Sequence, residues 1–202
     1  MSNRFLDKAY TAADSAEALY DAWAATYDAE LGENGYVTPV RCAKALAAHS
    51  RDLTDPILDF GCGTGLSGLA LKRAGFATLD GVDVSADMLK GAAAKDIYRT
   101  LSQIAPSTPL THPKGHYAAI TCIGVIGTGA APVEVFDLVM DGLATGGLTV
   151  LSLNDHALAE PRFEAKLASY MSTGRAKLLF QDYGPHIPGI NLNANVYVLE
   201  KT

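Results

Sequence analysis

The stretch ILDFGCGTG, residues 57–65, decides the fold of this 202-residue chain. A short apolar run leads directly into Gly61, Gly63 and Gly65, and a helical pattern begins after the last of them. Such a run is typical of a buried parallel strand. The glycines permit positive φ angles and let a ligand approach the backbone, and the helix that follows presents free N–H groups. The stretch therefore predicts a strand–turn–helix unit with a ligand site at the turn.

Strands and helices alternate along the chain around this unit. Strand-like runs cover residues 56–60, 77–84, 117–123, 148–153, 176–183 and 194–200, and helical patterns cover 12–31, 37–49, 66–73, 86–94, 133–143 and 161–172. The last two strands are joined by GPHIPGINLN, which is short and has no helical pattern, so we expect an antiparallel hairpin there. The pattern predicts an α/β sandwich with a mostly parallel sheet. We expect a helical cap over residues 1–50 and one continuous α/β domain over 51–202.

The composition favours small-molecule chemistry over nucleic-acid or membrane binding. The net charge is −6 and no cluster of Lys and Arg is present, whereas phosphate backbones are bound through concentrated basic residues. No apolar run approaches the roughly 18 residues that span a bilayer, and the first residues do not form a signal-peptide pattern. The three cysteines are far apart and predict neither a metal site nor a disulfide framework. We expect a cytoplasmic protein, monomeric or weakly dimeric.

Three residues narrow the class of ligand at the glycine turn. A dinucleotide fingerprint requires glycine at position 66, where this chain has Leu66. The carboxylate of Asp59 would repel a diphosphate and attract a cationic amino group. Asp83, at the end of the next strand, can accept hydrogen bonds from both hydroxyls of a ribose. Together they favour a nucleoside that carries an amino-acid group.

These stretches resemble a known family. ILDFGCGTG, GVDVSADML (81–89) and LATGGLTVLSL (143–153) resemble, in order and spacing, motifs of class I S-adenosylmethionine-dependent methyltransferases. YDAWAATYDAELGENGY (20–36) and PHIPGINLNANVYVLEK (185–201) are most similar to the methyltransferase-like branch named after the Williams–Beuren region. The resemblance covers roughly residues 20–200. It implies a Rossmann-like three-layer sandwich with a seven-stranded sheet, S-adenosylmethionine as cofactor, and methyl transfer to a small-molecule acceptor.

The resemblance also implies the residues that bind the cofactor. The glycine turn would hold the methionine part, Asp83 the ribose, and Val84 with Met88 the adenine. The expected cofactor-binding residues are Asp59, Gly61, Cys62, Gly63, Gly65, Asp83, Val84, Met88, Cys122, Tyr20, Trp23 and Tyr27. The three aromatic residues stand at helical spacing, which suits a core stripe as well as a ligand wall. The chain departs from the family at Ala118, where members often have an acid, and IAPSTP (104–109) offers no acid to the adenine.

Catalysis by such a site depends mainly on positioning. The sulfonium group activates its own methyl group, so holding the two reactants in line can supply much of the rate. A base is needed only for an acceptor that is protonated at the working pH, and the candidates are His186 and His156, near strand ends. We expect the N-terminal helices to close over the cofactor.

Two other functions stay open at this point. The first is a cofactor-binding regulatory module without catalysis, which Ala118 makes conceivable. The second is an NAD(P)-dependent oxidoreductase, against which Leu66, Asp59 and the closing hairpin speak.

Overall fold

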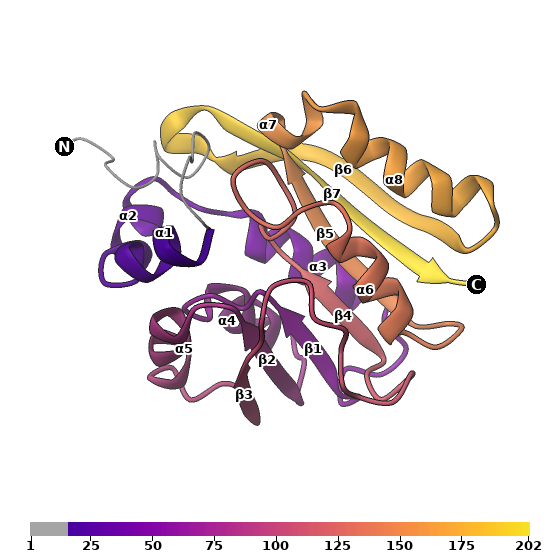
Figure 1. The fold of residues 1–202 in the computed structure, drawn as a ribbon, viewed down its shortest axis with the longest axis horizontal. Helices are drawn as coiled ribbons and strands as arrows, with labels where there is room; N and C mark the ends of the chain where they lie inside the picture. Colours follow the sequence, from indigo (N-terminus) through magenta and orange to yellow (C-terminus); the bar gives the residue numbers. More distant parts are fainter. Residues whose placement is uncertain (1–15) are drawn as a thin grey trace.

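A seven-stranded sheet forms the centre of the molecule in a computed structural model that describes residues 16–202. The strand order is β3-β2-β1-β4-β5-β7-β6 (Figure 1). The strands are β1 (Ile57–Phe60), β2 (Leu79–Asp83), β3 (Thr100–Gln103), β4 (Ala119–Cys122), β5 (Leu148–Asn154), β6 (Ala176–Ile187) and β7 (Leu192–Lys201). The first five are parallel to one another, and β7 is antiparallel to both β5 and β6. The predicted mostly parallel sheet with a terminal antiparallel hairpin is confirmed.

Helices cover both faces of this sheet and give the three-layer sandwich. On one face α3 (Thr38–His49) and α4 (Leu66–Arg73) share a core with the sheet, and α5 (Ala86–Ala93) lies beside α4 in Figure 1. On the other face α6 (Val135–Gly142), the short α7 (Asp155–Leu158) and α8 (Pro161–Ser172) complete the larger core. Within residues 16–202, no helix has both the length and the apolar composition needed to cross a bilayer.

Several helix ends follow local chemistry that is visible in the sequence. The patterns over 66–73 and 161–172 become α4 and α8 with the same bounds. Ser85 caps α5, because its side chain accepts a hydrogen bond from the Met88 N–H (3.0 Å). Gly75 follows α4 with φ +106°, as expected for a left-handed residue that terminates a helix.

The predicted helix over 12–31 is interrupted in the structure. Residues 12–15 lie outside the described part, and the remainder forms α1 (Ala16–Trp23) and α2 (Tyr27–Glu33). The Thr26 N–H bonds to the Trp23 carbonyl (3.0 Å), an i to i−3 bond that closes a turn instead of continuing the helix. The Thr26 hydroxyl then donates to the Glu30 carboxylate (2.6 Å), one turn into α2. The break lets two short helices fold over the end of the sheet.

Two further departures concern the strands. β3 arises from the stretch 95–113, where no period is visible, because this edge strand is mostly exposed and needs no apolar alternation. β6 extends to Ile187, so His186 lies inside a strand and not in the loop where we expect it. The link between β6 and β7 shrinks to the single turn η1 (Pro188–Ile190).

The expected cap over residues 1–50 also needs correction in its described part, residues 16–50. The residues of α3 that face the sheet, Cys42, Ala43 and Leu46, share one core with Ile57 and Val198. This helix is therefore a layer of the sandwich. The two helices α1 and α2 lie off the sandwich, to the left in Figure 1, and pack against the β6–β7 end through the cluster Leu19, Trp23, Leu31, Ile187 and Leu192. We use the word cap below for α1 and α2 alone.

Candidate cofactor site

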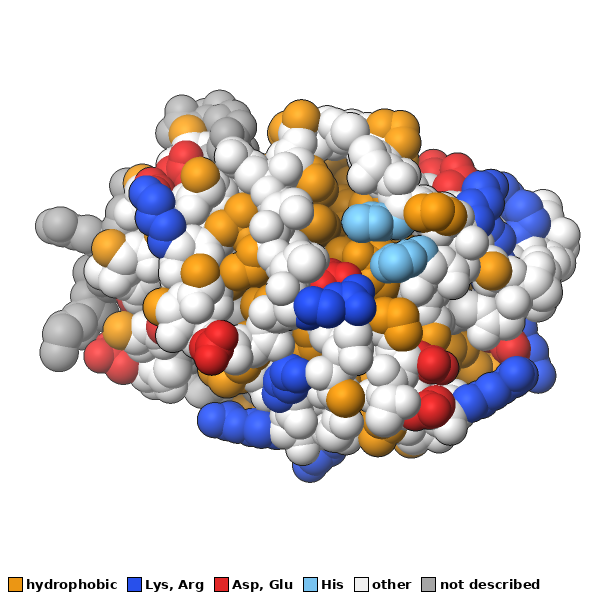
Figure 2. Space-filling model, turned by 90° about the horizontal axis from the view of Figure 1, so that it is seen from below, with side chains coloured by type: hydrophobic (Ala, Val, Ile, Leu, Met, Phe, Trp, Pro, Cys, Tyr) orange, Lys and Arg blue, Asp and Glu red, His pale blue; other side chains and the backbone are white. Residues whose placement is uncertain are grey.

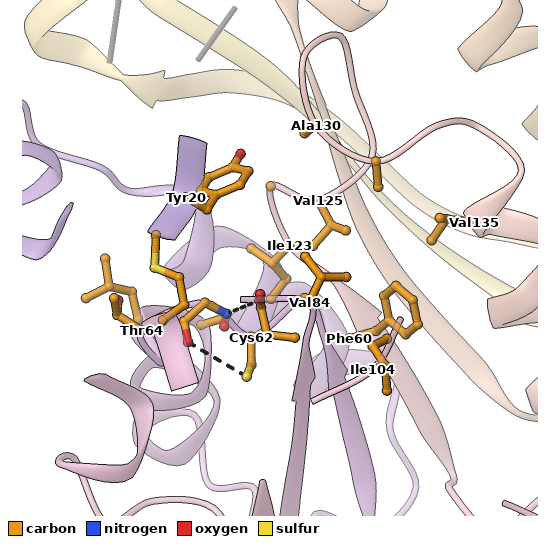
Figure 3. A pocket seen from close by; sticks show the side chains of 18 of the residues that line it. Tyr20, Phe60, Cys62, Thr64, Val84, Ile104, Ile123, Val125, Ala130 and Val135 are labelled. Carbon is orange, nitrogen blue, oxygen red and sulfur yellow. Dashed lines mark hydrogen bonds between the residues drawn. The ribbon is translucent and has the colours of Figure 1, made fainter. Parts of the chain in front are cut away.

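A cavity of about 340 Å³ lies where the carboxyl ends of β1, β2 and β4 meet the cap (Figure 3). Open α/β sheets bind ligands in this crevice. The lining residues come from the cap, the glycine turn, the end of β2 and the segments that follow β3 and β4: Tyr20, Tyr27, Tyr36, Pro39, Phe60, Gly61, Cys62, Gly63, Thr64, Leu66, Ser67, Asp83, Val84, Met88, Ile104, Pro106, Ser107, Ile123, Gly124, Val125, Ala130, Ala131, Pro132 and Val135. Most of these side chains are apolar.

The glycine turn contributes its backbone to the cavity. The N–H groups of Gly61 and Cys62 both donate to the Val82 carbonyl (2.8 and 3.0 Å), which fastens the turn to β2. Gly61 has φ +71°, and a Cβ there would stand 2.5 Å from Val125 Cγ2. Gly63 has φ +53°, and a Cβ there would meet nothing within 4 Å. The turn therefore packs closely at Gly61 and presents open backbone at Gly63.

Asp83 lies at the end of β2 and lines the same cavity. Its Oδ2 accepts a hydrogen bond from the Gly63 N–H (2.8 Å) and its Oδ1 accepts one from the Ser85 N–H (2.9 Å). Burial raises the pKa of this carboxyl, and the N–H donors partly offset that effect. Each oxygen of a carboxylate has a second lone pair. The group can therefore accept two hydroxyls of a ligand while it holds the glycine turn.

Asp59 occupies a different position from the one we expect. Its carboxylate is fully buried below the turn and does not line the cavity. It accepts hydrogen bonds from the hydroxyls of Ser67 (2.6 Å), Tyr98 (2.6 Å) and Thr121 (2.8 Å). Burial raises the pKa of this carboxyl, and the three hydroxyl donors act in the opposite direction. The structure thus corrects the expected contact with a ligand amine: Asp59 supports the turn from below.

Three more of the expected contacts lie outside the main cavity. Gly65 precedes α4 with φ +93°, and a Cβ there would stand 3.3 Å from the Tyr98 ring, so this glycine makes room for protein and not for ligand. Cys122 is a core residue of β4 that is 1% exposed. Trp23 packs edge-on against Tyr27, with 4.6 Å between ring centroids, and lines only a smaller neighbouring hollow.

The remaining expected contacts are brought together. Tyr20 and Tyr27 of the cap face the turn across the cavity, and Val84 with Met88 forms the wall beyond Asp83. Figure 3 shows Tyr20 on the opposite side of the cavity from Val84. Cys62 also lines the cavity, but burial raises the pKa of its thiol, which makes it a poor nucleophile. It is a small wall residue.

The two histidine candidates differ in their surroundings. His186 is 4% exposed and lines the small hollow of about 50 Å³ that adjoins the main cavity. Its Nδ1 lies 2.8 Å from the Thr38 hydroxyl, its ring meets Tyr36 edge-on, and burial lowers its pKa to about 4. His156 is exposed on α7 and lines neither hollow. The structure brings only His186 to the site.

Sequence reasoning missed the far wall of the cavity. Ile104 follows β3, Val125 and Pro132 come from the segment between β4 and α6, and Val135 is the first residue of α6. Tyr36 belongs to YDAWAATYDAELGENGY, but no periodicity marks it. The single usable signal is positional, because each of these segments follows a parallel strand and must therefore lie at the same edge of the sheet.

A further hollow, of about 430 Å³, lies at the opposite, amino end of the sheet. It is lined by the starts of β1, β4 and β5 and by charged residues of neighbouring loops, among them Arg51, Asp52 and Asp55. Figure 2 shows the molecule from below, where hydrophobic, histidine and charged side chains are mixed on the surface around this end of the sheet. Neither the glycine turn nor Asp83 reaches it.

The strand order, the glycine turn and the acid after β2 define the class I fold of S-adenosylmethionine-dependent methyltransferases. Comparison with known proteins agrees. A family model described as a methyltransferase domain matches residues 36–188. Methyltransferase-like protein 27 of Homo sapiens is 35% identical over 120 residues, which are 56% of this chain and 48% of that protein. The chain thus spans about half the length of this relative.

Solved structures share the fold at low sequence identity. One is a chain of the complex between the Haloferax volcanii Trm112 methyltransferase activator and its methyltransferase, with TM-score 0.67, 16% identity, and coverage of 93% of this chain and 99% of that one. Another is geranyl diphosphate methyltransferase in complex with S-adenosylmethionine, with TM-score 0.63, 15% identity, and coverage of 88% and 91%. The chain belongs to the methyltransferase domain family, with the class I fold, and its cofactor is S-adenosylmethionine.

Proposed function

We propose that this protein transfers a methyl group from S-adenosylmethionine to a small-molecule acceptor with a largely apolar body. One observation carries the proposal. The cavity does not end at the glycine turn but continues between the cap and the segment after β4, where Ile123, Val125 and Ala130 form apolar walls. Ligand pockets for small molecules have this character, with apolar walls and few polar groups.

The residues present fit the cofactor as follows. The open backbone at Gly63 accommodates the methionine part, Asp83 accepts the ribose hydroxyls, and Val84 with Met88 packs on the adenine. The bound cofactor supplies an electrophilic methyl group. The protein residues then have to orient the acceptor and exclude water. Tyr20 and Tyr36 stand where the main cavity meets the small hollow, at the boundary that an acceptor would occupy.

His186 contributes to this function as a neutral group. Since burial lowers its pKa to about 4, the imidazole carries no charge at pH 7. The low pKa also means that a proton taken from the acceptor would not be held strongly. We therefore propose that His186 forms a hydrogen bond to the acceptor. We also infer that the acceptor is nucleophilic enough to react without a strong base to remove its proton.

The test is turnover with fractionated metabolites. The protein is incubated with S-adenosylmethionine and low-molecular-mass cell extract, while release of S-adenosylhomocysteine is measured and products are screened by mass spectrometry for an added methylene. We expect release that depends on one small-molecule fraction and is lost in the Asp83→Ala variant. Release only with protein or nucleic-acid fractions would overturn the acceptor class. No release with any fraction would favour the regulatory module.

A further inference from the structure

Two aspartates of the cap are tied to the two segments that bind the cofactor. In α2, Asp28 Oδ1 accepts a hydrogen bond from the Thr64 hydroxyl of the glycine turn (2.5 Å). In α1, the Asp21 carboxylate accepts one from the Ser85 hydroxyl. Ser85 stands between Asp83 and Met88 and caps α5 with the same side chain. Each half of the cofactor site is thus connected to the cap by one carboxylate.

Lys95 closes the first of these ties into a ring. Its Nζ donates to Asp28 Oδ2 (2.6 Å) and to the Thr64 carbonyl (2.6 Å). The Lys95 side chain is 17% exposed and the Asp28 side chain 43%, so the ion pair is partly open to solvent. Charge-assisted hydrogen bonds are nevertheless stronger than neutral ones. Asp28, Thr64 and Lys95 therefore hold one another in a fixed arrangement above the turn.

The hydrogen-bonded ring of Asp28, Thr64 and Lys95 constrains Thr64, which lines the cofactor cavity. Thr64 lines the cavity directly after Gly63, and both its hydroxyl and its carbonyl are bound in the ring. A shift of the turn would stretch the bonds to Asp28 and Lys95, and a shift of the cap would pull on the turn. The free energies of cap closure and of turn ordering are therefore coupled, and such coupling acts in both directions.

We propose that Asp21 and Asp28 are positioning residues that couple closure of the α1–α2 cap to cofactor occupancy. They do not line the cavity and act on the cofactor through Ser85 and Thr64. The cap closes fully only over an ordered turn, and the bound cofactor dissociates slowly only while the two ties hold. This role goes beyond the choice of acceptor, and its test needs no acceptor.

The primary test measures the dissociation rate of S-adenosylhomocysteine from the full chain by stopped-flow displacement. Asp28→Asn removes the ion pair with Lys95 but keeps an oxygen for Thr64. We expect dissociation to be faster by about 5- to 20-fold, which is below the full value of a hydrogen bond to a charged group because Asp28 is partly exposed to solvent. The double variant with Asp21→Asn should be faster still, and added salt should accelerate the wild type more than Asp28→Asn.

The chain offers a matched control in Asp137. This aspartate also accepts one bond from a lysine, Lys166 Nζ (2.7 Å), and one from a hydroxyl, that of Tyr170 (2.8 Å). It lies on α6, outside the cap, and does not line the cavity. Asp137→Asn should destabilise the fold to a similar extent and leave dissociation unchanged. If S-adenosylhomocysteine dissociates from Asp28→Asn at the wild-type rate, or no faster than from Asp137→Asn, the proposal is overturned.

Trp23 gives a second readout that does not depend on the rate. It is the single tryptophan of the chain, lies in α1 and is 2% exposed. In Asp21→Ala/Asp28→Ala we expect acrylamide to quench its fluorescence more strongly, and S-adenosylhomocysteine to reverse part of that increase. Quenching equal to the wild type, with and without ligand, would contradict the coupling. Circular dichroism of the same samples confirms that the sandwich is folded.

Discussion

The two ends of the central sheet each have a hollow of comparable size, and only the hollow at the carboxyl end is the candidate cofactor site. The hollow at the amino end measures about 430 Å³ and the one at the carboxyl end about 340 Å³. The carboxyl end alone combines open glycine backbone at Gly63, a buried acid at Asp83 and an aromatic cap. Strand direction and a few aligned groups therefore define the site, and cavity size does not.

The largest effect is expected for Gly61→Ala, compared with Gly146→Ala at the amino end. Both glycines have positive φ, +71° and +84°, but a Cβ at position 61 would stand 2.5 Å from Val125 and a Cβ at position 146 would meet nothing within 4 Å. Backbone strain costs each variant of order 1–3 kcal/mol of stability. We expect Gly61→Ala alone to lose affinity for S-adenosylhomocysteine, by more than about 100-fold, because overpacking adds to the strain. Equal affinities of Gly61→Ala and Gly146→Ala for S-adenosylhomocysteine, measured by calorimetry, would contradict the assignment of the cofactor site to the carboxyl end.

The next effect compares two acids of one strand. Asp83 ends β2 at the cavity, while Asp80 lies near its start and accepts hydrogen bonds from Arg99 (3.0 Å) and Thr100 (2.8 Å). We expect Asp83→Ala to weaken cofactor binding by about ten- to hundredfold, the size of one or two hydrogen bonds to a charged group. Asp80→Asn should lower the melting temperature and leave the affinity unchanged. An Asp83→Ala affinity within a factor of two of the wild type contradicts the ribose assignment.

The sequence predicts features that depend on local backbone patterns better than features that depend on contacts between distant side chains. The alternation of strands and helices, the hairpin and the turn over 57–65 follow from local patterns, since periodicity and glycine spacing reflect backbone geometry. The far wall of the cavity and the role of Asp59 could not be predicted. They depend on which side chains meet after folding, and the partner Tyr98 lies in a stretch without any period. The sequence places His186 in a loop, because Gly184 and Pro185 beside it are typical of a turn, whereas β6 continues through these residues to Ile187.

A smaller effect on binding is expected for Asp59→Asn. This variant distinguishes a residue that supports the glycine turn from one that contacts the cofactor. The carboxylate receives three hydroxyl bonds under the turn, and a neutral amide cannot accept all three with the same geometry. We expect a loss of stability of about 1–3 kcal/mol, measured by urea unfolding. Affinity for S-adenosylhomocysteine should fall by less than about fivefold, well below the effect at Asp83. A hundredfold loss of affinity in a variant of normal stability would instead indicate that Asp59 contacts the amine of the cofactor directly.

The smallest effect on cofactor binding is expected for His186→Gln, which instead changes the pH dependence of stability. The folded pKa of about 4 lies below the usual 6.5, so the unfolded chain binds more protons between these values. The stabilising contribution is complete above pH 6.5 and is lost as the pH falls towards 4, by about 3 kcal/mol at 1.36 kcal/mol per pKa unit. Urea unfolding of the variant should lack this part of the acid destabilisation. Identical pH profiles for both proteins would show that His186 titrates normally.

The central claim is that the carboxyl-end cavity is built for a nucleoside bearing an amino acid and not for a dinucleotide. Calorimetric titration of the wild-type protein with S-adenosylhomocysteine and with NAD, side by side, tests it most directly. We expect one saturable site for S-adenosylhomocysteine, lost in Gly61→Ala and kept in Gly146→Ala, and no heat of binding for NAD. Saturable binding of NAD that Gly61→Ala abolishes, with none of S-adenosylhomocysteine, would contradict it.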